Sequence, residues 1–129
     1  MKEKQVDLSS KDLSDLVIHG MLEKKATDII LLDLRKLNNT ITDFFVICSG
    51  NSDTQIDAIA TSIDAEVYKS SGQSPWHKEG LQNKEWILLD FVNVVAHVFN
   101  SEKRAFFDIE SLWGDAEITN IDESLKTII

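Results

Sequence analysis

FFVICSGNS, at residues 44–52, is the stretch of sequence that decides the fold. Its first five residues form a continuous apolar run, which is typical of a strand covered on both faces. The polar residues after Cys48 end that strand, and Ser52 is placed to cap a following helix. The apolar face of that helix recurs at helical spacing and consists of Ile56, Ile59, Ala60, Ile63 and Val67. The stretch therefore predicts a buried strand followed by a helix packed on a sheet.

Upstream, the sequence predicts one helix and another buried strand. Ser9 and Asp12 have the spacing of a capping box, and the apolar residues after them recur at a helical period. Residues 28–34 (DIILLDL) form a second apolar run, rich in Ile and Leu. We expect residues 1–8 to be a flexible leader in front of these elements.

Downstream, the pattern changes from helical to strand-like. The expected elements are a short strand at 76–80, strong strands at 86–91 and 94–99, and a last helical segment from Ser101 towards Trp113. Residues 115–129 have an acidic first half and few packing signals, so we expect a mobile tail there. The expected fold class is α/β (α+β), with one mixed β-sheet and helices packed on it in a single domain at 9–114.

The composition limits the class of protein. The 129 residues are 43% hydrophobic, which suits one globular domain with its own core. Cys48 is the one cysteine of the sequence, so no intramolecular disulfide can form and a reducing compartment is indicated. The N-terminus has no apolar signal segment, and no stretch reaches the roughly 18 apolar residues of a membrane span. We therefore expect a cytoplasmic protein with no membrane partner.

The charge balance favours basic partners. The chain has 22 acidic and 13 basic residues, giving a formal net charge of −9. Nucleic-acid-binding proteins usually gain affinity from Lys and Arg that neutralise phosphates, so we expect no DNA partner and little direct contact with RNA. The negative field attracts basic proteins, although solubility alone would equally explain it.

The sequence offers few candidates for catalysis or metal binding. The three histidines, His19, His77 and His97, lack the spacing of metal ligands. Cys48 precedes a turn like a nucleophile elbow, but that turn needs a small residue where Val46 stands. We therefore predict no catalytic residue and no metal, and we interpret Cys48 as a buried structural thiol.

The turn at 49–52 has an alternative interpretation as a phosphate cradle, because it leads into a helix N-terminus. It resembles the Gly-Ser turn of nucleotidyltransferases, which hold Mg²⁺ with closely spaced strand carboxylates. Asp33, Asp43 and Asp90 are single acids on or beside the predicted strands. We therefore expect no cofactor and no enzyme activity, and a divergent nucleotide-binding protein is the alternative.

Two predicted strands carry aromatic and polar side chains in alternating rows, because side chains of a strand alternate with period two. The rows are Trp86, Leu88 and Asp90 on one strand and Val95, His97 and Phe99 on the next. If both rows face the same way, they form a surface with the aromatic anchors common in protein interfaces. Packing beneath a helix is the alternative for each aromatic. Such a face could also be buried in a homodimer of the free protein.

Taken together, these segments resemble the ribosomal silencing factor family (RsfS, also called Iojap-like). The matching segments are EKKA at 23–26, Asp28-Ile29, Leu32-Asp33, TDFFVICSGNS at 42–52, Glu79-Gly80, WILLD at 86–90, VVAHVF at 94–99, Arg104 and Leu112-Trp113. The resemblance spans about residues 8 to 116 in order, without large gaps. Asn93 and Phe107 differ from the family pattern, which commonly has an acid and a Tyr there.

The resemblance implies a translation inhibitor that is not an enzyme. Members of this family have a nucleotidyltransferase-like topology without the catalytic carboxylates. They bind ribosomal protein number fourteen on the 50S subunit and block association with the 30S subunit, which represses translation when nutrients are scarce. Some members act in large-subunit biogenesis, which is a second alternative for this chain. The expected location is the cytoplasm, on the large ribosomal subunit, with little direct rRNA contact.

The resemblance also implies a partner-binding sheet, with Trp86 as its central anchor. The other residues carried over to this site are Leu88, Asp90, His97 and Phe99 as neighbours and Trp76 as a rim contact. The alternative for His97 is a structural role instead of contact with the partner. Arg104 and Trp113 are interpreted as structural residues.

Overall fold

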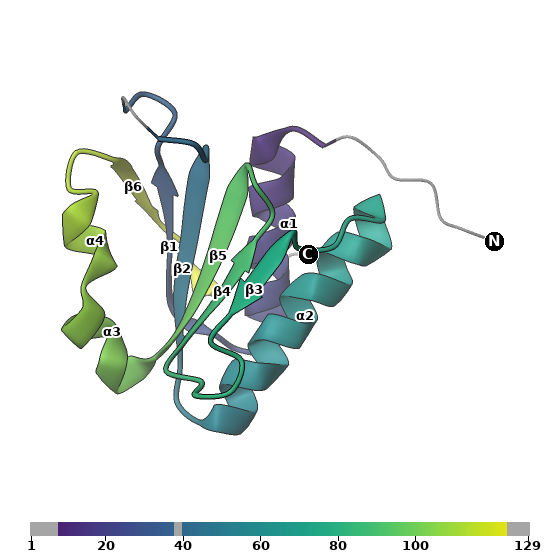
Figure 1. Cartoon of the computed structure of the whole chain (residues 1–129), viewed down its shortest axis with the longest axis vertical. Helices are drawn as coiled ribbons and strands as arrows, with labels where there is room; N and C mark the ends of the chain where they lie inside the picture. The colour runs from purple at the N-terminus through teal and green to yellow at the C-terminus, as the bar shows by residue number, and fades with distance from the viewer. Residues whose placement is uncertain (1–7, 38–39, 124–129) are drawn as a thin grey trace.

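The computed structural model describes residues 8–37 and 40–123, which form one mixed sheet with helices on both sides (Figure 1). In chain order the elements are α1 (Ser10–Glu23), β1 (Thr27–Asp33), β2 (Phe44–Gly50), α2 (Asp53–Ser71), β3 (His77–Glu79), β4 (Trp86–Asp90), β5 (Val94–Asn100), α3 (Ser101–Phe107), α4 (Ile109–Leu112) and β6 (Glu117–Asn120). This arrangement confirms the predicted fold class, an α+β domain built on one mixed sheet.

The strand order is β3-β4-β5-β2-β1-β6 within the described residues. β2 and β5 are parallel, and the other neighbouring pairs are antiparallel. This parallel pair lies in the middle of the sheet, and α2, β3 and β4 lie between its two strands in the chain. A tight hairpin can join only antiparallel strands, so a parallel pair needs a longer crossover connection of this kind.

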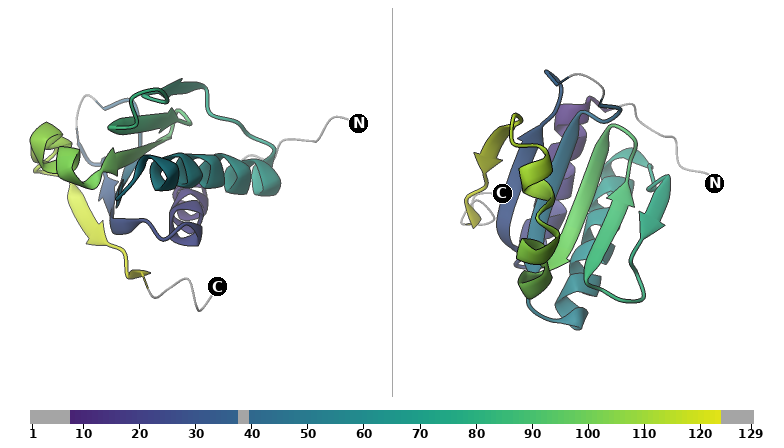
Figure 2. Two further views of the ribbon diagram at one scale, coloured as in Figure 1. Left: turned by 90° about the horizontal axis from the view of Figure 1, so that it is seen from below. Right: turned by 60° about the vertical axis from the view of Figure 1, so that its left-hand side comes forward.

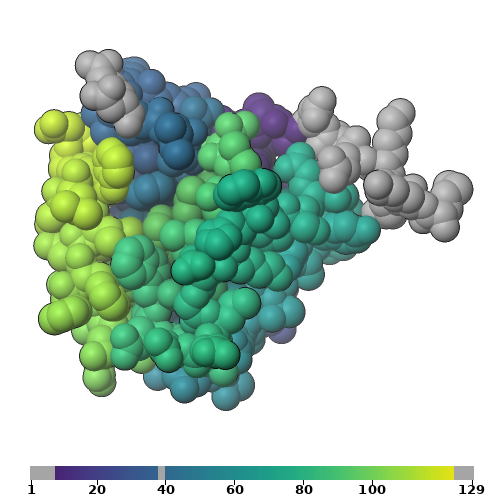
Figure 3. Space-filling view, in the orientation of Figure 1, coloured from purple at the N-terminus to yellow at the C-terminus, as the bar shows by residue number. Residues whose placement is uncertain are grey.

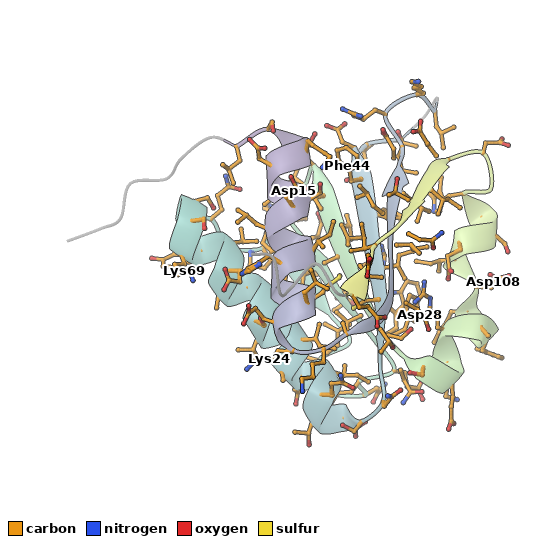
Figure 4. All side chains as sticks on the ribbon, turned by 180° about the vertical axis from the view of Figure 1, so that it is seen from behind. Asp15, Lys24, Asp28, Phe44, Lys69 and Asp108 are labelled. Carbon is orange, nitrogen blue, oxygen red and sulfur yellow. The ribbon has the colours of Figure 1, made fainter. Side chains whose placement is uncertain are left out.

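The helices α1 and α2, which were predicted from their apolar periods, cover one face of the sheet (Figures 1 and 2). Ser9 Oγ accepts the backbone N–H of Asp12, and Ser52 Oγ accepts that of Gln55, so each helix begins with a hydroxyl cap. α2 ends at Gly72, whose φ of 73° is the left-handed conformation common at helix ends. Figure 4 shows the outer surface of this layer, where α1 lies in front of the sheet.

The opposite face is only partly covered. The short helices α3 and α4 pack over β1, β2 and β5, and they leave β3 and most of β4 uncovered (Figure 2). The predicted single helical segment after Ser101 is two helices, because Asp108 adopts a left-handed φ of 44° between them. The partial cover gives this face both a buried half and an accessible half.

The prediction of a mobile tail at 115–129 is wrong for its first part. Residues 117–120 form β6, which pairs antiparallel with β1. The N–H of Ile121 donates to the carbonyl of Ile29 (2.9 Å), and its half-buried side chain packs against the core. Backbone pairing orders this acidic segment although its β6 side chains are exposed. Residues 124–129 lie outside the described part of the chain.

The leader predicted at 1–8 falls mostly outside the described part, which begins at Leu8. Leu8 is half-buried and packs against the core beside α1. The ordered domain therefore extends beyond the predicted limits of 9–114 at both ends.

Candidate functional site

The two predicted rows of side chains do share one face of the sheet. In the β4–β5 register, Trp86 pairs with Phe99, Leu88 with His97 and Asp90 with Val95. The alternate residues of β4, Ile87 and Leu89, are buried against α1 and α2 on the other face. The conditional prediction that both rows face the same way is therefore confirmed. We call the surface formed by Trp86, Leu88 and Asp90 the aromatic face.

Trp86 lies at the boundary between the covered and uncovered halves of the sheet. Its indole is half-buried and stacks on Phe99, with ring centroids 5.0 Å apart and planes inclined by 23°. Phe107 of α3 contacts the same indole at 5.1 Å. The indole Nε1–H donates to Nδ1 of His97 over 2.9 Å. Three aromatic neighbours therefore fix the orientation of this ring.

His97 is a buried neutral histidine. Only 3% of the residue is exposed, and burial lowers its pKa to about 3. Because Nδ1 accepts the indole proton of Trp86, the ring proton of the neutral imidazole is on Nε2. Nε2 is buried without a hydrogen-bond partner among the described residues, and the ring meets Phe45 edge-on at 4.6 Å.

The structure separates the predicted contact residues by depth. The segment that contains β3 and β4, teal to green in Figure 3, lies at the accessible surface. Leu88 and Asp90 are half-buried there. Trp76 is 78% exposed but lies beside Leu13 and Phe91, on the side of α1. Phe99 is fully buried and His97 nearly so. The prediction that these two residues contact a partner as neighbours of Trp86 does not fit their burial, because α3 and Trp86 itself cover them. They lie behind Trp86 and support it.

Backbone geometry fixes Asp90 at the end of the aromatic face and ties Trp76, which comes just before β3, to the same strand. The N–H of Trp76 donates to the carbonyl of Asp90 (2.7 Å). Asp90 Oδ1 accepts the N–H of Val92 (2.7 Å), where a left-handed φ of 77° makes the tight turn into β5. At the other end of β4, a Cβ on Gly80 would clash with the carbonyl oxygen of Trp86, and its φ of 81° also favours glycine.

The turn that suggested a phosphate cradle is occupied by internal hydrogen bonds. Ser52 caps α2, and the N–H of Asn51 donates to Oε1 of Gln55. Ser101 Oγ donates to the carbonyl of Gly50 (2.9 Å) or to Oδ1 of Asn51 (2.6 Å). These contacts tie the end of β2 to the starts of α2 and α3.

The other candidates for a catalytic or metal-binding site are a buried thiol and side chains that do not come together. Cys48 is fully buried, and burial raises the pKa of its thiol well above the usual range. Within residues 8–37 and 40–123, no three His, Cys, Asp or Glu side chains come together as metal ligands. None of the helices in these ranges has the length and apolar character needed to cross a membrane.

A known protein family matches almost the whole length of this chain. Residues 7–128 match the family described as "Ribosomal silencing factor during starvation" (RsfS). The chain belongs to the RsfS family. The family match includes residues 115–128, so it extends past the resemblance expected to end near residue 116.

Relatives in several bacteria match most of this chain. The Ribosomal silencing factor RsfS of Halalkalibacterium halodurans is 35% identical over 115 residues, which cover 89% of this chain and 97% of that protein. The RsfS of Bacillus subtilis is 34% identical, with 89% and 96% covered. A crystal structure of a Chromobacterium violaceum protein superposes with a TM-score of 0.77 at 34% identity, over 83% of this chain and 88% of that one.

Arg104, expected to be structural in an RsfS fold, anchors α3 to the sheet. Its guanidinium donates to the carbonyl of Asp28 (2.6 Å) and to Ser49 Oγ (2.9 Å), and it makes two 3.2 Å contacts with the carboxylate of Glu110. The carbonyl it meets belongs to a bulge in β1, where Asp28 has a φ of 50°. Sequence reasoning found Arg104 but not this bulge, because no local residue pattern marks it.

The structure adds Phe107 and Phe45 to the residues that shape this site. Phe107 reaches Trp86 from α3, and Phe45 of β2 lies between His97 and Trp113, 4.6 and 5.6 Å from their rings. The alternation of side chains in FFVIC could have placed Phe45 on this face. The position of Phe107 depends on how α3 folds back over the sheet, which the sequence does not indicate.

Proposed function

We propose that this chain represses translation by binding the large ribosomal subunit through ribosomal protein number fourteen, which blocks association with the small subunit. The aromatic face is the proposed contact surface. The observation that carries the proposal is the half-exposed indole of Trp86, which is held in one orientation where the cover by α3 ends. Membership of the RsfS family supplies the ribosomal context.

The aromatic face has the properties of a protein-binding anchor. Binding hot spots are enriched in Trp, and a rigid aromatic ring loses little conformational entropy when a partner covers it. The half-buried apolar Leu88 and the half-buried acidic Asp90 follow Trp86 in the same row of β4. An apolar centre with a polar rim is the usual anatomy of a specific interface.

The charge distribution supports a basic protein partner rather than bare rRNA. Three lysines in β3, in the turn before β4 and in α3 are each paired with an acid: Lys78 with Asp64 (2.9 Å), Lys84 with Asp57 (3.0 Å) and Lys103 with Glu85 (3.9 Å). Their charges are therefore largely neutralised, and the formal net charge of −9 dominates the field of the whole chain. Such a field speeds the encounter with a cationic ribosomal protein and repels phosphate backbones.

The proposed mechanism is steric and involves no chemical step. A domain docked on the surface where the two subunits meet prevents contact between them by occupying that surface. We accordingly propose that the protein works in the cytoplasm on free large subunits, without a catalytic residue, metal or cofactor.

Co-sedimentation with ribosomal particles tests this proposal. The protein should pellet with separated large subunits and should be absent from small subunits and from intact ribosomes. Trp86→Ala should reduce retention, whereas Tyr68→Ala should not, because Tyr68 is an exposed aromatic residue on α2, on the far side of the sheet. Equal retention on all particles, or on none, would contradict the proposal.

A further inference from the structure

The bond between Trp86 and His97 is a diagonal cross-strand contact at the centre of the proposed site. Trp86 pairs directly with Phe99, and His97 pairs with Leu88, so the two rings meet across the register. Diagonal neighbours lie within reach of long aromatic side chains. The 2.9 Å separation of indole Nε1 and imidazole Nδ1 is a normal hydrogen-bond distance.

The protonation state of His97 keeps this bond available. An indole N–H can only donate, so Nδ1 must be unprotonated to accept it. Burial holds the pKa of His97 near 3, so the imidazole stays neutral at physiological pH. The acceptor is therefore permanent under working conditions.

The choice of histidine at this position carries a cost in stability. Nε2 is buried and makes no hydrogen bond to any described residue. An unsatisfied buried polar group destabilises the folded protein, and an apolar side chain of similar size would avoid this penalty. Among the described residues, the one hydrogen-bond partner of the imidazole is the indole of Trp86, which suggests that its value lies in what it does to the indole.

Stacking alone does not define the orientation of the indole. Phe99 and Phe107 contact the ring at 5.0 and 5.1 Å, and a ring rotated by half a turn would present a similar face to both. The hydrogen bond distinguishes the two orientations because only one points Nε1–H at His97. It therefore selects a single shape for the exposed edge of Trp86.

We propose that His97 is a positioning residue for partner binding, whose Nδ1 fixes the indole of Trp86 in the one orientation that the partner recognises. This inference rests on the proposed function, in which Trp86 is the anchor. His97 does not touch the partner. It acts by pre-organising Trp86, which reduces the ordering that binding would otherwise require.

Two substitutions separate positioning from a merely structural role. His97→Leu removes the acceptor and the unsatisfied Nε2 while keeping an apolar side chain of similar size. His97→Asn keeps an oxygen close to the position of Nδ1 but leaves a cavity. A positioning role predicts that His97→Leu is stable and binds poorly, whereas His97→Asn is less stable and binds better than His97→Leu. A structural role predicts that binding follows stability in both variants.

A spectroscopic arm needs no ribosome, and its first measurement uses the wild-type protein alone. In ¹⁵N-labelled wild-type protein, the indole N–H of Trp86 should exchange with solvent far more slowly than that of the exposed Trp76. In His97→Leu its exchange should become faster, and in His97→Asn it should stay protected. If the indole N–H of Trp86 in the wild type exchanges as fast as that of Trp76, the proposal is overturned.

The binding arm uses large ribosomal subunits prepared from the source cells. His97→Leu should weaken binding about five- to tenfold, the scale of one lost hydrogen bond. In a Trp86→Phe background, the same change should have no further effect. Wild-type affinity in His97→Leu, or an equal loss in the Trp86→Phe background, would overturn the inference alone. Failure of the wild-type protein to bind large subunits would instead overturn the proposed function.

Discussion

The two faces of the sheet are closed in different ways. On one face, α1 and α2 bury a continuous layer of mostly aliphatic side chains from the sheet. On the other, α3 and α4 cover only part of the surface, and aromatic rings with one buried imidazole mark the limit of the cover. The comparison teaches that the first face holds the fold together, whereas the second face leaves a fixed aromatic edge accessible.

The largest expected effect concerns the face of the sheet that α1 and α2 cover, which we call the helical face. Ile63 is fully buried on α2, and α1 approaches its backbone closely at Gly20. Ile63→Ala should lower the free energy of unfolding by about 3 kcal/mol, because it removes buried methyl groups and leaves a cavity. Urea unfolding followed by circular dichroism measures the loss.

The matched control for Ile63 is Ile41→Ala, because Ile41 is 96% exposed. Its effect on the free energy of unfolding should stay within about 0.5 kcal/mol. Similar losses for the two variants would mean that the helical face does not carry the stability assigned to it.

The second prediction concerns binding by the aromatic face. Trp86→Ala should weaken binding to the purified ribosomal protein number fourteen by about 2 kcal/mol or more, the scale of a hot spot. Isothermal titration measures the affinity, and circular dichroism checks that the variant is folded. Tyr68→Ala should bind like the wild type. A folded Trp86→Ala with unchanged affinity would remove Trp86 from the site.

The third prediction uses the buried imidazole of His97. In the unfolded chain a histidine titrates near pH 6.5, whereas burial lowers the pKa of His97 to about 3 in the folded protein. The unfolded state therefore gains the proton first, and this residue's contribution to stability is lost as pH falls below 6.5. Between pH 7.5 and 5.5, wild type should lose about 1.4 kcal/mol more stability than His97→Leu.

Urea unfolding of the two proteins at both pH values gives this difference. His19, His77 and the carboxylates are common to both proteins, so their contributions cancel. A pH dependence that is the same in both would show that the imidazole is not held neutral by burial.

The smallest expected effect concerns β6, at the edge of the sheet. Ile118 is 46% exposed, and the strand is held mainly by backbone pairing with β1. Ile118→Thr keeps a β-branched side chain and should cost less than about 1 kcal/mol in the free energy of unfolding. Urea unfolding checks this value, and a loss as large as that of Ile63→Ala would assign β6 a core role.

The sequence was sufficient where apolar periodicity and burial coincide. The predicted caps at Ser9 and Ser52 are present, and the strand predicted at 28–34 is found at Thr27–Asp33. These elements are recognisable because their buried side chains repeat at the period of the backbone itself. The predicted rows on β4 and β5 were correct for the same reason.

The errors arose where tertiary contacts decide the structure. All four residues of β6 are exposed, so their side chains carry no burial pattern, and β1 supplies the pairing. The burial of Phe99 depends on α3 and Phe107, which come later in the chain and fold back over the sheet. No local pattern at Phe99 itself distinguishes a buried ring from an exposed one.

Light scattering of mixed ribosomal subunits tests the central claim most directly. Small and large subunits, mixed with magnesium, should fail to associate when the wild-type protein is added first, and the Tyr68→Ala variant should block association equally well. Trp86→Ala should allow the particles to form at matched concentration. Normal association in the presence of saturating wild-type protein would contradict the account.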